Sequence, residues 1–386
     1  MTSTPKQART HHEGQKQNEA NDAVRIQSGQ TKTVTLPDGS VTPYVLYPSV
    51  DADASRGIVI IWPGFGMGAR YFRPIAEELS QRGFSVLAAE LRGQGEQTAV
   101  AKEGYGWGYP DLVNEDYRTA VDVSRETFGD DLPVYFLCHS LGGQVATLYA
   151  ALAVEQTNYD KRSAVGEVTG PSDAAATTDP AAAIDSATAT GATDTAKHNT
   201  DPVISPLPEV DGIFCVGSGE PHHIHFTGKI RTRLRIGARL MPLVAKYLGY
   251  WPDGKFDIAG YGRQPKPLIT QWGRFGRTGQ WFVDPAPDAM SNSATGSVNN
   301  SLVASESCQE QASEDIQSVI TIPVLFLTCA GDEDCPLPSA QALAKRYPGG
   351  APVEFIDEPL GHNRWARQPK TIADRFEAFV AAHTTK

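Results

Sequence analysis

Short apolar runs alternate with helical patterns along most of the chain. Residues 57–62 and 84–90 are mostly apolar and rich in strand-forming side chains, as in strands buried on both faces. Between them, residues 71–82 place apolar side chains at helical spacing, and Gly83 follows as a typical helix stop. The order strand, helix, strand predicts a βαβ unit with parallel strands.

The same alternation recurs further along the chain. It predicts strands at 133–139, 210–217, 322–328 and 353–356, and helices at 110–128, 142–152, 339–346 and 371–382. Residues 31–36 and 41–47 alternate apolar and polar side chains around turn residues 37–40, which predicts an antiparallel hairpin at one edge. Together these elements predict the α/β class, with a mostly parallel central sheet and helices on both faces.

Two kinds of segment interrupt this pattern. Residues 163–205 consist largely of Ala, Thr, Asp and Gly, and cannot bury enough apolar surface to offset the entropy of ordering. Residues 224–282 are instead rich in aromatic residues and Arg, as an ordered cap over a core would be. The expected parts are a disordered tail (1–25), a first core part (26–162), a low-complexity insertion (163–205), a core strand (206–219), a cap or lid with a loose C-terminal part (220–315) and a second core part (316–386).

Charge and composition narrow the class of protein. A formal net charge of −11 over 386 residues argues against a nucleic-acid-binding surface, which needs a basic excess on one face. No apolar run approaches the roughly 18 residues of a membrane span, and residues 1–21 lack the apolar segment of a secretory signal. Five cysteines without metal-ligand spacing are expected to be reduced. We therefore expect a cytoplasmic protein, and the oligomeric state stays open.

One serine stands where a buried strand pattern changes into a helical one. The apolar run 134–139 breaks at Ser140, and a helical pattern with Gly142 and Gly143 follows. This is the arrangement of a nucleophile elbow, a tight turn that holds a serine hydroxyl above the sheet. Cys138 replaces the first glycine of the usual Gly-x-Ser-x-Gly pattern, and we expect it to be a small buried side chain behind the elbow.

A serine nucleophile needs a base within hydrogen-bond reach, and the base needs a carboxylate to orient it. On a fold of this kind both follow the serine in chain order, on loops after later strands. Asp334, on the loop after strand 322–328, is the predicted acid, with Asp332 as the second choice. His362, on the loop after strand 353–356, is the predicted base.

The oxyanion formed by such an attack needs backbone N–H donors already in place. We predict the amide of Leu141, directly after the serine, and the amide of Phe65, in the glycine-rich loop after strand 57–62. The spacing of Gly64, Gly66 and Gly68 fits neither a dinucleotide fingerprint nor a Walker loop, so phosphate binding is not expected there.

Two further clusters suggest other kinds of binding. His222, His223 and His225 are good ligand types for zinc or copper, but no typical cysteine or carboxylate spacing accompanies them. We therefore interpret them as a polar loop at the entrance of the cap and predict no metal and no cofactor. The Lys- and Arg-rich helical pattern at 229–248 could bind an anionic substrate or a membrane surface, although a solvated basic face is favoured.

With the elbow, the acid and the histidine placed, the chain resembles the α/β-hydrolase superfamily, and within it the serine-aminopeptidase-like and monoacylglycerol-lipase-like group. Residues 88–95 look like the group's Asp-x-Arg-Gly-His-Gly loop, with Glu90 and Gln94 replacing the aspartate and the histidine. Segments 248–254, 261–266 and 271–277 are similar to a bacterial set of predicted α/β hydrolases of undefined substrate. The resemblance implies the fold and the triad, and in relatives the 88–95 loop is structural.

The predicted function is hydrolysis of a carboxylic ester by Ser140 through an acyl-enzyme intermediate. The partner would be a small-molecule ester or acyl substrate, with Trp272 and Phe275 in an apolar pocket beneath the cap. The same triad could serve an acyltransferase, a thioesterase or a peptidase. A non-catalytic, hydrolase-like binding protein is a further alternative, motivated by the departures at Cys138, Glu90 and Gln94.

Overall fold

A computed structural model of the chain describes residues 29–164, 206–257, 261–280, 322–347 and 349–383. Within this part, eight strands form one sheet in the order β1-β2-β4-β3-β5-β6-β9-β10. The strands are β1 (Gln30–Thr35), β2 (Val41–Tyr47), β3 (Ile58–Trp62), β4 (Ser85–Ala88), β5 (Val134–His139), β6 (Gly212–Val216), β9 (Val324–Cys329) and β10 (Val353–Ile356). β2 pairs antiparallel with β1 and β4, and the other neighbours are parallel, which confirms the mostly parallel sheet.

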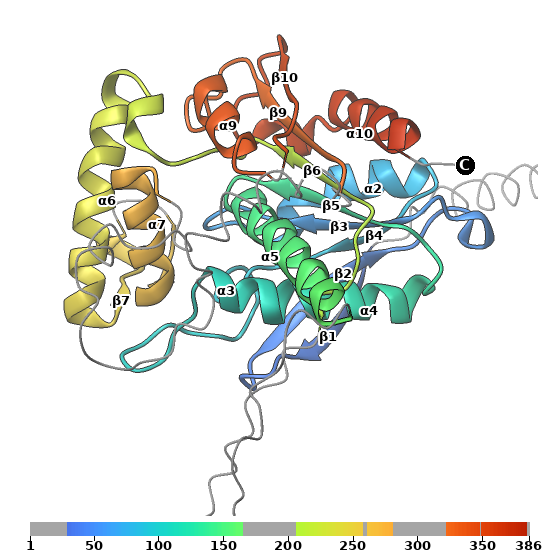
Figure 1. Ribbon diagram of the computed structural model, residues 1–386, viewed down its shortest axis with the longest axis horizontal. Coiled ribbons are helices and arrows are strands. Elements are labelled where there is room, and N and C mark those ends of the chain that lie inside the picture. Colours follow the sequence, from blue (N-terminus) through green and yellow to red (C-terminus); the bar gives the residue numbers. More distant parts are fainter. Residues whose placement is uncertain (1–28, 165–205, 258–260, 281–321, 348, 384–386) are drawn as a thin grey trace, which may run out of the picture.

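Helices cover both faces of the sheet, as the continuously apolar strands predict (Figure 1). They are α2 (Arg73–Gln81), α3 (Tyr109–Asp111), α4 (Arg118–Phe128), α5 (Leu141–Ala164), α9 (Leu337–Ala344) and α10 (Lys370–His383). Ile58 and Ile60 of β3 pack in one apolar cluster with α4 and α5, whereas Val59 and Ile61 pack in the other with α2 and α10. Alternate side chains of a strand point to opposite faces, so β3 is buried on both sides.

Residues 220–257 and 261–280, which we call the helical insert, lie between β6 and β9 in the chain. They contain α6 (Gly228–Leu248), β7 (Tyr250–Trp251), β8 (Gln264–Pro265) and α7 (Lys266–Thr278), and appear in yellow and orange beside the sheet in Figure 1. The two helices approach closely at Gly273, where a Cβ atom would lie 2.8 Å from the carbonyl oxygen of Ala238. Gln271 of α7 accepts the backbone N–H of Tyr109 at 2.9 Å, which ties the insert to α3.

Some boundaries differ from the predicted ones. The strand predicted over 84–90 ends at Ala88, and Glu90 lies in the following loop, where its side chain accepts the backbone N–H groups of Ala69 and Glu96. The helix behind the elbow extends to Ala164, beyond its predicted end. Within the predicted helix 110–128, residues Leu112–Tyr117 form a π-helical turn. The predicted tail at 1–25, almost all of the low-complexity insertion and the loose end of the predicted cap lie outside the described residues.

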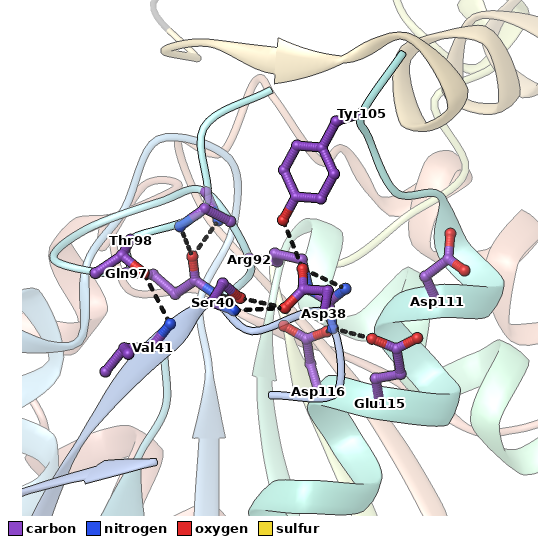
Figure 2. Close-up of polar contacts among 12 residues, drawn as sticks. Asp38, Ser40, Val41, Arg92, Gln97, Thr98, Tyr105, Asp111, Glu115 and Asp116 are labelled. Carbon is purple, nitrogen blue, oxygen red and sulfur yellow. Dashed lines mark hydrogen bonds and ion pairs between the residues drawn. The ribbon is translucent and has the colours of Figure 1, made fainter. Parts of the chain in front are cut away.

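A buried arginine joins the loop after β4 to the edge hairpin and to the π-helical turn (Figure 2). Arg92 is 3 % exposed and lies within 3.1 Å of carboxylate oxygens of Asp38, Glu115 and Asp116. Burial raises the pKa of Asp116 to about 7, although the charge of Arg92 acts in the opposite direction. A buried charge is costly unless it is paired, and these carboxylates supply the partners that connect the 88–95 loop to the hairpin and to the π-helical turn.

None of the helices in the described part of the chain is both long and apolar enough to cross a membrane. The basic side chains of α6, including Arg231, Arg235 and Arg239, are exposed to solvent. Large apolar side chains of the same helix are also exposed, with Leu243 at 51 % and Tyr247 at 76 %.

Candidate active site

Ser140 occupies a tight turn between β5 and α5. Its φ angle is +50°, the only positive φ of a non-glycine residue in the described part of the chain. Such a backbone costs free energy for an L-residue and persists only where its surroundings enforce it. Gly142 and Gly143 allow the close packing, because a Cβ on Gly142 would lie 2.8 Å from the Trp62 carbonyl oxygen and one on Gly143 2.2 Å from Ser218 Oγ.

The glycine-rich loop after β3 lies against the serine. A Cβ atom at Gly64 would stand 2.8 Å from Ser140 Cβ, so only glycine fits this approach. Gln94 accepts the backbone N–H of Gly66 at 2.5 Å, and Glu90 accepts that of Ala69 at 3.2 Å. The two residues that depart from the resembled loop pattern therefore fix the loop that carries Phe65.

His362 is oriented by Asp332, and the prediction of Asp334 as its partner is wrong. Nδ1 of His362 donates to the Asp332 carboxylate, with its oxygens at 3.0 and 3.1 Å. Asp332 follows Gly331, whose φ is +76°, and also accepts the backbone N–H of Cys335 at 2.7 Å. This turn directs the Asp332 side chain inward, where it is 1 % exposed, while Asp334 is exposed.

The pair of His362 and Asp332 fits closely against β6. Gly217 has a φ of +61°, and a Cβ atom there would lie 3.1 Å from Asp332 Oδ2 and 3.2 Å from His362 Nδ1. Burial lowers the pKa of His362, but the hydrogen bond and charge of Asp332, together with the charge of Asp334, outweigh it and raise the pKa above its usual value. The arrangement favours an imidazolium that is held in one orientation.

His139 lies directly behind this pair. It is buried, its ring centroid is 4.6 Å from that of His362, and its Nδ1 donates to the Val216 carbonyl oxygen at 3.1 Å. Nε2 lies 2.9 Å from the side-chain amide of Asn363. Burial and the positive charge of His362 lower the pKa of His139 to about 3, so its ring is neutral. The sequence pattern around His139 indicates only a buried strand, because the fold alone brings this ring beside His362.

Cys138 is fully buried in β5 and is not among the residues that line the cavity at Ser140. Burial raises the pKa of its thiol well above the usual value, and the neighbouring Cys215 raises this pKa further. A protonated, enclosed thiol is a poor nucleophile. Cys138 therefore packs behind the turn, as expected.

One cavity of about 250 Å³ brings most of the predicted site residues together. Its lining includes Ser140, His362, Phe65, Leu141, Trp272 and Asp334. Phe275 is not part of this lining: its ring is fully buried and its centroid lies 5.1 Å from the guanidinium of Arg346, so the structure does not bring it to the predicted pocket. Tyr261, which sequence reasoning did not identify as a site residue, also lines the cavity and stacks on Phe65 with 4.8 Å between ring centroids.

A second cavity of about 250 Å³ adjoins the first inside the helical insert. The two share Arg233, Leu234, Tyr261 and Trp272, and the second is otherwise lined by Ile236, Gly237, Leu240, Met241 and Trp251. Its walls are thus largely apolar.

The side chains of Glu220, His222 and His225 converge at the base of the insert. Within the described residues they are the one group whose ligand atoms are close enough together to hold a metal ion.

Comparison with known proteins supports the fold. Residues 53–162 match the family model for "Serine aminopeptidase, S33". No match to this chain is found among curated proteins. A monoglyceride lipase from Saccharomyces cerevisiae, solved as a soluble variant with a substrate analog, has a similar structure at a TM-score of 0.55 and 13 % identity, covering 94 % of this chain and 98 % of that one.

Two further solved structures are similar at lower scores. An α/β hydrolase from Penicillium sp. sh18 has a TM-score of 0.47 at 13 % identity, covering 92 % of this chain and 98 % of its own. A thermophilic esterase from Thermogutta terrifontis has a TM-score of 0.46 at 12 % identity, and the match covers 92 % of this chain and 100 % of the esterase. The resemblance to α/β hydrolases is confirmed at the level of the fold, by the family model over residues 53–162 and by the similar structure of the monoglyceride lipase.

Proposed function

We propose that this chain, which has the α/β-hydrolase fold, is a serine hydrolase that cleaves carboxylic esters through an acyl-enzyme intermediate. The observation that carries the proposal is the strained Ser140, which shares one cavity with His362 while Asp332 holds the other side of that imidazole. A serine, a histidine and a carboxylate in these relations form the usual machinery for activating a hydroxyl nucleophile.

The reaction follows from the roles of these groups. Asp332 holds Nδ1–H of His362, so the free Nε2 takes the proton from Ser140 as its oxygen attacks the ester carbonyl. Backbone N–H groups of Leu141 and Phe65 would stabilise the oxyanion, and the start of α5 adds its positive end at the same place. The tetrahedral intermediate expels the alcohol, which receives the proton from His362. Water, activated by the same imidazole, then releases the acid.

The largely apolar walls of the second cavity support an apolar acyl or aromatic group as the substrate's main binding element. Trp272 and Tyr261 line both cavities, so a group that enters beside Ser140 could continue into the insert between α6 and α7. Burying apolar area in such a space contributes about 25 cal/mol per Å². The helical insert would thus act as a cap over the reacting serine.

The test combines a covalent probe with a substrate panel. The full-length protein should react with a fluorophosphonate and hydrolyse p-nitrophenyl esters, and Ser140→Ala should lose both properties while keeping its fold by circular dichroism. A folded protein that neither reacts with the probe nor cleaves any ester would refute the proposal and favour a binding protein.

The same panel separates the other reactions open to this machinery. Because the matched family model describes a serine aminopeptidase, aminoacyl p-nitroanilides belong in it. Acyl-CoA thioesters and an added alcohol acceptor test thioester cleavage and acyl transfer. A higher kcat/KM for one of these substrates than for the esters would replace the ester assignment. The proposed roles of Ser140 and His362 would stay the same.

A further inference from the structure

A carboxylate and two imidazoles meet where the chain passes from β6 into the helical insert. His222 and His225 are three residues apart in a 3-10 turn, in which the His225 N–H donates to the His222 carbonyl oxygen at 3.1 Å. This turn places both rings beside Glu220, with 5.7 Å between the two ring centroids. The intervening His223 is used elsewhere, since its Nδ1 donates to the Gly276 carbonyl oxygen at 3.3 Å.

The donor atoms lie near the spacing of a tetrahedral metal site. Oε1 of Glu220 lies 3.2 Å from Nε2 of His225 and 3.7 Å from Nδ1 of His222, and all three donors lie within 4.8 Å of one another. With Zn–N and Zn–O bonds of about 2.0–2.1 Å, tetrahedral ligand atoms stand roughly 3.3 Å apart. Small movements of two imidazoles would therefore place all three donors around one ion.

The surroundings hold the carboxylate in position and keep space beside it. Arg346 donates from Nε to Oε2 of Glu220 at 2.9 Å, which leaves Oε1 directed toward the imidazoles. Gly279 faces the same atoms: a Cβ there would lie 2.6 Å from His222 Nδ1 and 3.0 Å from Glu220 Oε1. A side chain at 279 would thus occupy the space next to two of the three donors.

We propose that Glu220, His222 and His225 bind a divalent transition-metal ion, with Zn²⁺ as the best-matched member of this class. Two imidazoles and one carboxylate suit the borderline metals, and a tetrahedral set of three protein ligands leaves the fourth position for water. The side chains of His222 and His225 are 14 % and 21 % exposed, so an ion can reach them from solvent. Glu220, only two residues before His222, is the carboxylate that the sequence-based interpretation did not take into account.

Such an ion would stiffen the base of the helical insert. Glu220 is fixed to the start of α9, because its N–H donates to the Ser339 carbonyl oxygen at 2.9 Å and its own carbonyl accepts Ser339 Oγ at 2.8 Å. Arg346 also donates to the carbonyl oxygen of Gly279, directly after α7. The site therefore lies where the chain enters the insert and beside the end of its last helix.

The experiment is calorimetric titration of the chelator-stripped, tag-free full-length protein with ZnCl₂. We expect one saturable site, a rise in Tm on Zn²⁺ addition, and binding weakened by more than about tenfold in His222→Gln and in His225→Gln. His223→Gln is the matched control and should bind as the parent protein does, since His223 is outside the donor set. Bound Co²⁺ should show the visible absorption of a four-coordinate ion in the parent and not in His222→Gln.

Circular dichroism of each metal-free variant establishes that it is folded before its titration is compared, and His222→Gln and His225→Gln provide independent tests. No saturable Zn²⁺ binding by the parent protein would overturn the proposal. Equal affinity in either folded variant would overturn it as well, because the ion would then be bound by other histidines. Either result would leave Glu220 as a partner of Arg346 and the imidazoles in an ordinary polar network.

Discussion

Asp332 and Asp334 differ by two positions in the chain but face different surroundings. Asp332 is buried against His362 and accepts a backbone N–H, whereas Asp334 is exposed on the cavity wall. A carboxylate that orients a catalytic imidazole acts by fixing its tautomer and stabilising the imidazolium. The two residues can therefore be distinguished by their effects on the rate of ester cleavage.

Asp332→Asn should lower kcat by about four orders of magnitude, because the amide no longer enforces the productive tautomer of His362. Asn retains an oxygen that can accept the Cys335 N–H, so the turn should persist. Asp334→Asn is the matched control and should change kcat only a few-fold. Steady-state kinetics on one p-nitrophenyl ester measures both, and similar losses in the two variants would contradict the assignment.

The pH dependence of ester cleavage should report the raised pKa of His362. The base must be neutral to accept a proton, so activity should fall as pH drops through a pKa above the usual 6.5. Asp334→Asn removes one negative charge that favours the imidazolium, so it should move this acidic limb to lower pH. His139 stays neutral over this range. The measurement is the pH profile of kcat/KM for the parent protein and for Asp334→Asn. An acidic limb at the same pH in both proteins would show that Asp334 does not act on His362.

At the scale of single elements, α6 forms part of the wall of the second cavity and carries a glycine in the middle of the helix. Gly237 lines that cavity, and a Cβ atom built there meets only Met241 Sδ, at 3.9 Å. Glycine within a helix costs roughly 0.5–1 kcal/mol relative to alanine. The position therefore leaves space in the cavity at the expense of helix stability.

Gly237→Phe should fill the second cavity and reduce kcat/KM for long-chain esters by about tenfold or more, while acetate esters change little. Gly237→Ala is the control: it should raise the free energy of unfolding by about 0.5–1 kcal/mol and leave the chain-length preference nearly unchanged. A p-nitrophenyl ester series and denaturant unfolding measure the two effects. Unchanged chain-length preference in Gly237→Phe would place the acyl group elsewhere.

At the scale of the whole molecule, the site is formed where segments distant in the chain meet at one end of the parallel strands. Ser140 follows β5, Asp332 follows β9, His362 follows β10, and the Phe65 loop follows β3. The carboxyl ends of parallel strands lie at the same edge of a sheet, so these loops converge. The helical insert covers this edge from one side and supplies Trp272 and Tyr261 to the cavity.

The sequence by itself determined the sheet, the helices on both faces, and which loops carry Ser140 and His362. These features depend on local patterns: apolar runs mark buried strands, helical spacing marks helices, and chain order assigns loops to strand ends. The family resemblance predicted which fold these elements form, but it did not indicate a substrate.

Only the tertiary structure decided which of Asp332 and Asp334 meets His362, that Phe275 faces Arg346, and that Glu220 joins two histidines. Each of these outcomes depends on where a side chain points after a turn or a helix. Directions of that kind are set by backbone angles such as those of Gly217 and Gly331, and by packing between segments far apart in the chain. A pattern along the chain specifies the elements, whereas the contacts between their ends depend on three-dimensional packing.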